Sequence, residues 1–163
     1  MSLACLLAVC LHVVNVSSAS PATIVEAQHE LDATYESIGV PLRWSDEPGS
    51  ILIVVRDDEP GALRDAARPV LGVAIHTAQG SLAAYVFYRR AAEQADRYGV
   101  PRAVVVGAAM AHEMGHLLLP TPRHADTGLM RGCWDYEEFV RAAQGRLRFS
   151  ADEAASIRAQ IAR

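Results

Sequence analysis

The sequence of 163 residues predicts a single α+β domain, because helical patterns stand on both sides of a run of extended segments. A helix is expected at residues 20–38, and extended segments follow one another from Val40 to Tyr88. A long apolar helix is expected at residues 103–119, and helical patterns recur towards the C-terminus. Helices before and after a run of strands are typical of a sheet packed against helices, and a chain of this length can bury one such core.

Local signals place the first helix and the strands. Ser20 and Pro21 suit a helix entry, a capping box can form at Thr23–Glu26, and Gly39 with Pro41 ends the helix. The continuous β-branched run Ile51–Val55 would mark a strand covered on both faces. The expected extended segments are Val40–Trp44, Ile51–Val55 (the β-branched run), Leu71–His76 and Leu82–Tyr88.

Further helices complete the expected domain. One or two helical turns are expected at Ala62–Arg68, and a short amphipathic helix at Arg89–Tyr98. Trp134–Ala143 is a loop or a short helix, and a capping box at Ser150–Glu153 opens a closing helix. The sequence contains no internal repeat and no linker, so residues 20–163 are expected to form one domain.

Residues 1–19 have the features of a signal peptide. Leu3–Val16 is mostly apolar, and Ser17–Ala19 offers the small residues that signal peptidase prefers. We therefore expect cleavage after Ala19 and a secreted or periplasmic protein. The apolar run is shorter than the roughly 20 residues of a membrane-spanning helix, so no membrane span is expected. A lipid anchor at Cys10, a mis-started N-terminus and a frayed apolar helix are the alternatives.

The charge pattern argues against a nucleic-acid-binding protein. The formal net charge is −4, the chain has no lysine, and its arginines are scattered. The sequence has neither the basic stripe typical of nucleic-acid binding nor a polybasic tail for a membrane surface. We expect a monomer without a nucleic-acid partner.

The cysteines leave no internal disulfide in the expected mature chain. Cys5 and Cys10 lie in the expected signal peptide, so Cys133 would be alone. Cys133 is expected to be a small buried hydrophobe, with a reactive thiol and a metal ligand as alternatives.

The apolar helix at residues 103–119 carries three polar side chains, His112, Glu113 and His116, in the pattern H-E-x-x-H. Residues four apart share one helix face, so both imidazoles can reach one metal ion. A helix that is apolar all round must be buried, and burying two imidazoles and a carboxylate is costly unless they find partners. We therefore predict a zinc ion on His112 and His116, with Glu113 beside its open side.

A third ligand is expected shortly after this helix. Pro120 ends the helix and the chain then turns, so that His124 can return to the ion. Two helical histidines and one histidine from a loop leave the fourth position for water, as catalytic zinc requires. The acidic alternatives to His124 are Asp126, Glu137 and Glu138.

These residues, together with Thr127-Gly128-Leu129-Met130, resemble the metzincin zinc metallopeptidases, in a small secreted bacterial form. That family carries H-E-x-x-H-x-x-G-x-x-H, followed by a methionine turn beneath the zinc. Here Leu119 stands at the glycine position and Pro122 at the position of the third ligand, while His124 comes two residues later. The resemblance covers residues 40–163.

The resemblance implies a zincin-like fold, with a mixed twisted sheet, a buried active-site helix and a C-terminal helix. The segment Leu71–His76 would be an antiparallel edge strand above the zinc, where an extended peptide can add to the sheet. Met130 would lie as a hydrophobic floor beneath the zinc. Arg131–Val140 would wall the pocket for the side chain just past the scissile bond. The strand positions expected to bind substrate are Gly72, Val73, Ala74 and Ile75.

The predicted function is zinc-dependent endopeptidase activity on extended polypeptides. Zinc would lower the pKa of its bound water towards about 7, and Glu113 would act as general base and then protonate the leaving amine. Tyr136, His76 and Tyr88 are candidates for an additional oxyanion donor. The alternatives are a catalytically inactive zinc-binding module and an apolar helix that carries the motif by coincidence.

Overall fold

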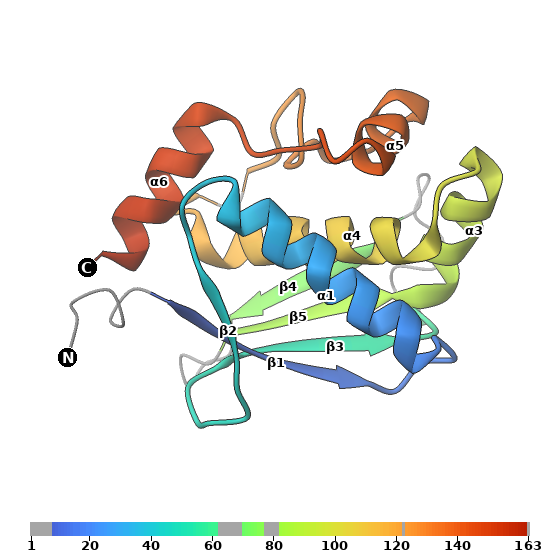
Figure 1. Ribbon diagram of the computed structural model, residues 1–163, viewed down its shortest axis with the longest axis horizontal. Helices are drawn as coiled ribbons and strands as arrows, with labels where there is room; N and C mark the ends of the chain where they lie inside the picture. Colours follow the sequence, from blue (N-terminus) through green and yellow to red (C-terminus); the bar gives the residue numbers. More distant parts are fainter. Residues whose placement is uncertain (1–7, 62–69, 77–81, 122, 163) are drawn as a thin grey trace.

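The structure is a computed structural model that describes residues 8–61, 70–76, 82–121 and 123–162. Its centre is a mixed sheet of five strands in the order β2-β1-β3-β5-β4, which confirms the expected α+β class (Figure 1). β1 is parallel to β2 and β3, and β3 is parallel to β5. The strands are β1 (Val9–Asn15), β2 (Leu42–Trp44), β3 (Ile51–Arg56), β4 (Gly72–His76) and β5 (Leu82–Phe87).

β4 is the antiparallel edge strand of this sheet. Among the described strands it pairs only with β5, in a register that sets Gly72 opposite Val86 and His76 opposite Leu82. The sequence predicts an extended segment here, and its position at the edge agrees with the expectation that came from the resemblance. The helix expected at Ala62–Arg68 and the connection at Thr77–Ser81 lie outside the described residues.

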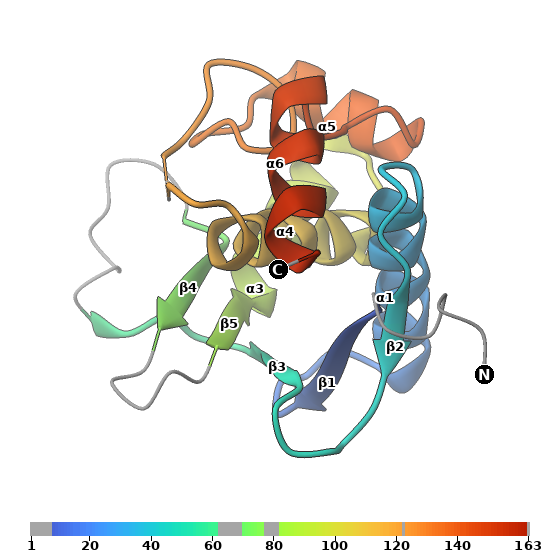
Figure 2. The same ribbon diagram turned by 90° about the vertical axis from the view of Figure 1, so that its left-hand side faces the viewer.

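The helices pack in two layers above one face of the sheet. α1 (Pro21–Glu36) and α4 (Arg102–Leu118) lie next to the sheet, and α5 (Tyr136–Ala143) and α6 (Ala151–Ile161) lie beyond α4 (Figures 1 and 2). α3 (Tyr88–Tyr98) follows β5 and ends at Gly99, whose φ of 67° is the left-handed conformation that favours glycine. α4 is therefore enclosed by the sheet, α1, α5 and α6.

Close contact between α1 and α4 depends on a glycine. A β-carbon on Gly107 would lie 2.6 Å from the backbone oxygen of Ala27, so only glycine allows this approach of the two backbones. The Tyr35 hydroxyl donates to the Ala111 carbonyl at 3.3 Å and ties α1 to α4 next to His112. α1 thus holds the helix that carries the histidine motif.

The N-terminal segment differs from the expectation. Val9–Asn15 forms β1, which lies between β2 and β3, and Leu11 is fully buried in the core. The folded unit therefore begins before residue 20, where the sequence places the start of the domain. Apolar residues in an extended run suit a buried strand as well as a targeting segment, which explains the difference. Cleavage after Ala19 would remove β1; secretion itself stays a prediction.

Ala19 is also part of the fold. Its side chain is buried, and its carbonyl accepts a hydrogen bond of 3.0 Å from the Asn15 side chain. Ser18 donates from its backbone and its hydroxyl to Asp57, at 2.9 and 2.8 Å. Among the described residues, we find no helix with the length and apolarity to cross a bilayer.

Candidate metal centre

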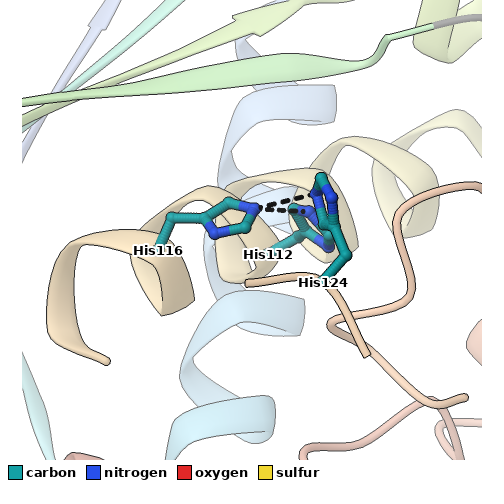
Figure 3. Close-up of side chains that lie close together, drawn as sticks. All are labelled: His112, His116 and His124. Carbon is teal, nitrogen blue, oxygen red and sulfur yellow. Dashed lines mark hydrogen bonds between the residues drawn. The ribbon is translucent and has the colours of Figure 1, made fainter. Parts of the chain in front are cut away.

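Three imidazoles converge beside the C-terminal half of α4 (Figure 3). His112 and His116 lie one turn apart on α4, and His124 returns to them from the loop that follows the helix. The Nε2 atom of His116 lies 3.0 Å from Nε2 of His112 and 3.1 Å from Nε2 of His124. The ligand atoms of all three lie within 4.8 Å of one another, a grouping that could hold a metal ion.

The acidic alternatives lie elsewhere. Asp126 is exposed, and the part of the chain that the structure describes places no carboxylate in the metal-ligand group. Glu138 is buried against Arg131, and Glu137 pairs with Arg141 on the surface of α5. Of the candidate third ligands, the structure brings only His124 to the other two histidines.

The two distances from Nε2 of His116 to its neighbouring imidazoles fit a metal site. Zinc–nitrogen bonds of about 2.0–2.1 Å in tetrahedral geometry set two ligand nitrogens about 3.3 Å apart. The two Nε2–Nε2 distances of 3.0 and 3.1 Å are close to that value. Without a cation, one proton or one lone pair on Nε2 of His116 would have to serve both contacts, because a neutral ring nitrogen carries only one of the two. One cation between three lone pairs satisfies all three nitrogens.

The Leu129 carbonyl fixes the tautomer of His112. It lies 2.7 Å from Nδ1 of His112, so Nδ1 carries the proton and donates to the carbonyl. Nε2 of His112 is then left with its lone pair, 3.0 Å from Nε2 of His116. Metal-ligating histidines commonly donate their second N–H in this way. The carbonyl also accepts from the Trp134 indole at 3.2 Å.

Burial keeps two of these imidazoles neutral. It lowers the pKa of His112 to about 4; the bond to Leu129 opposes this shift, and the charges of His116 and His124 reinforce it. Burial also lowers the pKa of His116, with a smaller contribution from His124. Neutral imidazole is the form that binds metal ions, so a metal can bind here at neutral pH without displacing protons from these two rings.

Glu113 is buried next to the edge strand. A β-carbon on Gly72 would lie 2.7 Å from Glu113 Cγ, 2.9 Å from Oε1 and 2.5 Å from the Tyr85 backbone oxygen, so only glycine fits at position 72. Burial raises the pKa of Glu113 to about 8. A carboxyl group that titrates near neutral pH is suited to taking up and releasing a proton.

A cavity of about 350 Å³ joins these groups. His112, Glu113, His116 and His124 line it on the side of α4 and its following loop. Trp134 and Phe139 contribute aromatic surface, and Arg131, Gly132 and Cys133 belong to the same wall. The strand residues that line the cavity are Gly72, Val73, Ala74 and His76; Ile75 is 40% exposed and does not line it.

Of the three candidate oxyanion donors, only His76 lines this cavity. Tyr88 is buried, and Tyr136 is 62% exposed. Cys133 is half-buried rather than fully buried, and it does not belong to the metal-ligand group.

Met130 packs against the motif helix. It is fully buried, and its Sδ would lie 2.5 Å from a β-carbon on Gly115, the residue before His116. Glycine at position 115 therefore admits the methionine to the surface of α4. In the same loop, a β-carbon on Gly132 would lie 2.8 Å from Cγ of His124. Both glycines are contact points that hold the loop against the histidines.

Two partners of the site went unrecognised in the sequence. Leu129 acts through its backbone carbonyl, for which a sequence carries no signal. Gln94 lines the cavity from α3, and the amphipathic pattern of that helix does not distinguish it from a surface residue. In contrast, the cavity-lining residues Arg131, Gly132, Cys133, Trp134 and Phe139 lie in the segment that the resemblance implies for a pocket wall.

Comparisons with known proteins give a likeness of fold. No family model matches the chain, and no curated protein matches it. A solved structure described as the GM1-bound form of the ECX AB5 holotoxin is similar, with a TM-score of 0.51 and 11% sequence identity. The match covers 94% of this chain and 80% of that one. At this identity the likeness concerns the fold alone.

Proposed function

We propose that this protein is a zincin-like, zinc-dependent metallopeptidase that cleaves extended polypeptides. One observation carries the proposal: three imidazole Nε2 atoms converge in a cleft that also contains the buried carboxyl group of Glu113. Three histidines and a neighbouring general base are the protein groups of a catalytic zinc site with an open fourth position.

His112, His116 and His124 would hold the zinc ion. When bound, zinc supplies a Lewis acid for the peptide carbonyl and lowers the pKa of water to about 7. The Leu129 carbonyl keeps the His112 ring oriented through its bond to Nδ1. Met130 supports the helix from below at Gly115. These contacts fix the ligands before the substrate arrives, which favours catalysis by preorganisation.

Glu113 would accept a proton from the attacking water and return it to the leaving amine. General acid–base catalysis of this kind requires a carboxyl group that can exist in both protonation states near the working pH. The burial that raises the pKa of Glu113 to about 8 meets that requirement. The contact with Gly72 keeps the carboxyl group in place beside the edge strand.

β4 would bind the substrate backbone. It pairs with β5 on one side, and no other described strand pairs with it on the other side. An extended peptide can add to such an edge through main-chain hydrogen bonds. A peptide bound along Gly72, Val73 and Ala74 would cross the cavity that Glu113 and the histidines line. This arrangement favours a polypeptide over a compact small molecule as substrate.

Cleavage of casein and of a quenched peptide library by the zinc-loaded protein tests the proposal. We expect Glu113→Gln to lower the cleavage rate by about 10²–10⁴-fold, because general-base catalysis contributes on that scale. Glu137→Gln is the matched control, since Glu137 lies exposed on α5 outside the cavity. Equal rates for Glu113→Gln and the parent would exclude Glu113 as the base. Zinc binding without any cleavage would instead indicate a catalytically inactive zinc-binding module.

A further inference from the structure

The four residues Leu129–Gly132 are here termed the support strip. They contact two of the three histidines directly, and they contact the residue before the third histidine. The Leu129 carbonyl accepts from His112, and Met130 packs on Gly115 beside His116. The Met130 carbonyl accepts from the Ala125 backbone N–H at 2.9 Å, and Gly132 lies against the His124 ring. The position of each ligand therefore depends on where this strip lies.

Arg131 anchors the strip to α5. Its Nη1 atom donates to Oδ2 of Asp135 at 2.8 Å and to Oε2 of Glu138. The Glu138 side chain is only 4% exposed, and its Oε2 also accepts from the backbone N–H of Asp135 at 3.0 Å. Glu138 therefore closes the capping box of α5 and binds the guanidinium group of the strip at the same time.

We propose that the Arg131–Glu138 ion pair is a positioning device for the metal centre: it fixes the support strip, and through it sets His124 and His112 for metal binding. This inference rests on the proposed function, because it concerns the same three ligands. Arg131 and Glu138 act through the strip and do not themselves ligate the metal.

His124 is the ligand that depends most on this anchor. Its side chain is exposed, whereas His112 is buried and His116 is partly buried in the motif helix. Helix geometry sets the other two ligands one turn apart. His124 does not lie in a helix. Its loop contacts the support strip through the β-bridge between Ala125 and Arg131 and through the contact of His124 with Gly132. Loosening Arg131 is therefore expected to displace the third ligand first.

Burial distinguishes this ion pair from a surface pair. Exposed pairs contribute little, whereas a buried carboxylate that loses its partner leaves an uncompensated charge. Arg102–Asp96 is the exposed comparison, with side chains 51% and 57% exposed. Arg102 binds Asp96 through two nitrogens, and neither residue lines the cavity, so Arg102→Met is the control for loss of an exposed arginine ion pair.

Zinc and cobalt binding by the full chain test the inference. The variants are Arg131→Met, Arg131→Lys and Glu138→Gln, with Arg102→Met as the control. Competition with a chromophoric chelator measures the zinc affinity. The visible spectrum of the cobalt(II)-loaded protein reports the ligand geometry. Thermal unfolding of the metal-free protein shows whether each variant is folded.

We expect Arg131→Met to weaken zinc binding about 10-fold or more and to change the cobalt spectrum, as loss of outer-shell support does at metal sites. Arg131→Lys should restore most of the affinity, because one nitrogen of Arg131 reaches both carboxylates. Glu138→Gln keeps an oxygen for the Asp135 N–H and should weaken zinc binding without unfolding the protein. Arg102→Met should bind zinc like the parent.

Two results would overturn the inference, and they distinguish failure of the positioning role from failure of the metal centre itself. If the parent binds zinc and the folded Arg131→Met and Glu138→Gln variants bind it equally well with the parental cobalt spectrum, the positioning role fails while the metal centre stands. If the parent itself takes up less than about 0.2 zinc per chain, the metal centre fails together with its positioning pair. If Arg131→Met does not fold, the folded Glu138→Gln variant decides between these outcomes.

Discussion

Gly72 of the edge strand lies directly against the side chain of Glu113 in the motif helix. A β-carbon at position 72 would lie 2.7 Å from Glu113 Cγ and 2.5 Å from the Tyr85 backbone oxygen. The backbone oxygen cannot move without disturbing the pairing of β4 and β5, so the glutamate side chain or the edge strand must shift. The strand that would bind substrate and the proposed general base are therefore coupled at one glycine.

Gly72→Ala is expected to impair catalysis more than metal binding. A displacement of the general base by about 1 Å can lower a rate by about 100-fold. The three histidines lie outside this contact, so zinc affinity should stay within a few-fold of the parental value. Peptide cleavage and chelator competition measure the two quantities. Gly61→Ala serves as the control, because a β-carbon there meets nothing within 4 Å.

His124→Ala is expected to weaken zinc binding by more than about 100-fold, beyond what loss of an outer-shell partner costs. The reason is that it removes one of three ligands and leaves two, fewer than a catalytic zinc site uses. Asp126→Ala, two residues along the same loop, should bind zinc like the parent, because Asp126 is outside the ligand group. Zinc retention at parental affinity by His124→Ala would mean that the third ligand lies elsewhere.

The pKa shifts of Glu113 and His112 lead us to expect opposite effects of pH on the stability of the metal-free protein. The pKa of Glu113 is raised from 4.5 to about 8, so its contribution to stability is present at low pH and is lost as pH rises through about 8. The pKa of His112 is lowered from 6.5 to about 4, so its contribution is present above 6.5 and is lost as pH falls through about 4. The two effects oppose each other between 4.5 and 6.5.

Above about pH 6.5 only the effect of Glu113 remains. We expect the free energy of unfolding to fall by about 2 kcal/mol between roughly pH 6.5 and 8, since one pKa unit corresponds to about 1.4 kcal/mol. Urea unfolding at a series of pH values, in the presence of a chelator, measures this free energy. Glu113→Gln should lack this decrease, and a parent protein with constant stability across this interval would contradict the buried, protonated state of Glu113.

Leu11→Ala is expected to destabilise the protein by about 2–5 kcal/mol, because it opens a cavity in a well-packed core. Leu11 is fully buried in β1, between β2 and β3. Val14→Ala, on the same strand at a half-buried position, should cost less. Denaturant unfolding compares the two variants. Parental stability of Leu11→Ala would mean that β1 is not part of the folded unit.

Local sequence patterns predicted much of the fold. The spacing of His112 and His116 on an apolar helix describes α4, and β-branched residues mark β3. The capping pattern at Ser150–Glu153 describes the start of α6, where the Ser150 hydroxyl accepts from the Glu153 N–H. Each of these features depends on residues close in the chain, which is why a sequence can reveal them.

Features that depend on distant residues were harder to predict. The apolar run that includes Leu11 fits a targeting segment and a strand equally, and only its pairing with Ile51 distinguishes the two. The hydrogen-bond acceptor for Nδ1 of His112 is a backbone carbonyl, which no residue type in the sequence indicates. In the sequence, Arg131 and Glu138 do not differ from charged residues on the surface of the protein. The path of the loop between His124 and the support strip includes Gly128, whose φ of 78° is a left-handed conformation that no local pattern specified.

The interior position of β1 has a consequence for synthesis of the chain. Val9 pairs with Leu42 and Leu11 pairs with Ile51, so the strand leaves the ribosome before either of its partners exists. During that interval its apolar residues have no sheet to join, and such segments are prone to associate with other chains. β1 can pair only once β2 and then β3 have been made, and long-range parallel pairing is intrinsically slow. The growing chain therefore carries an apolar strand without its sheet partners until residues 42–56 have been made.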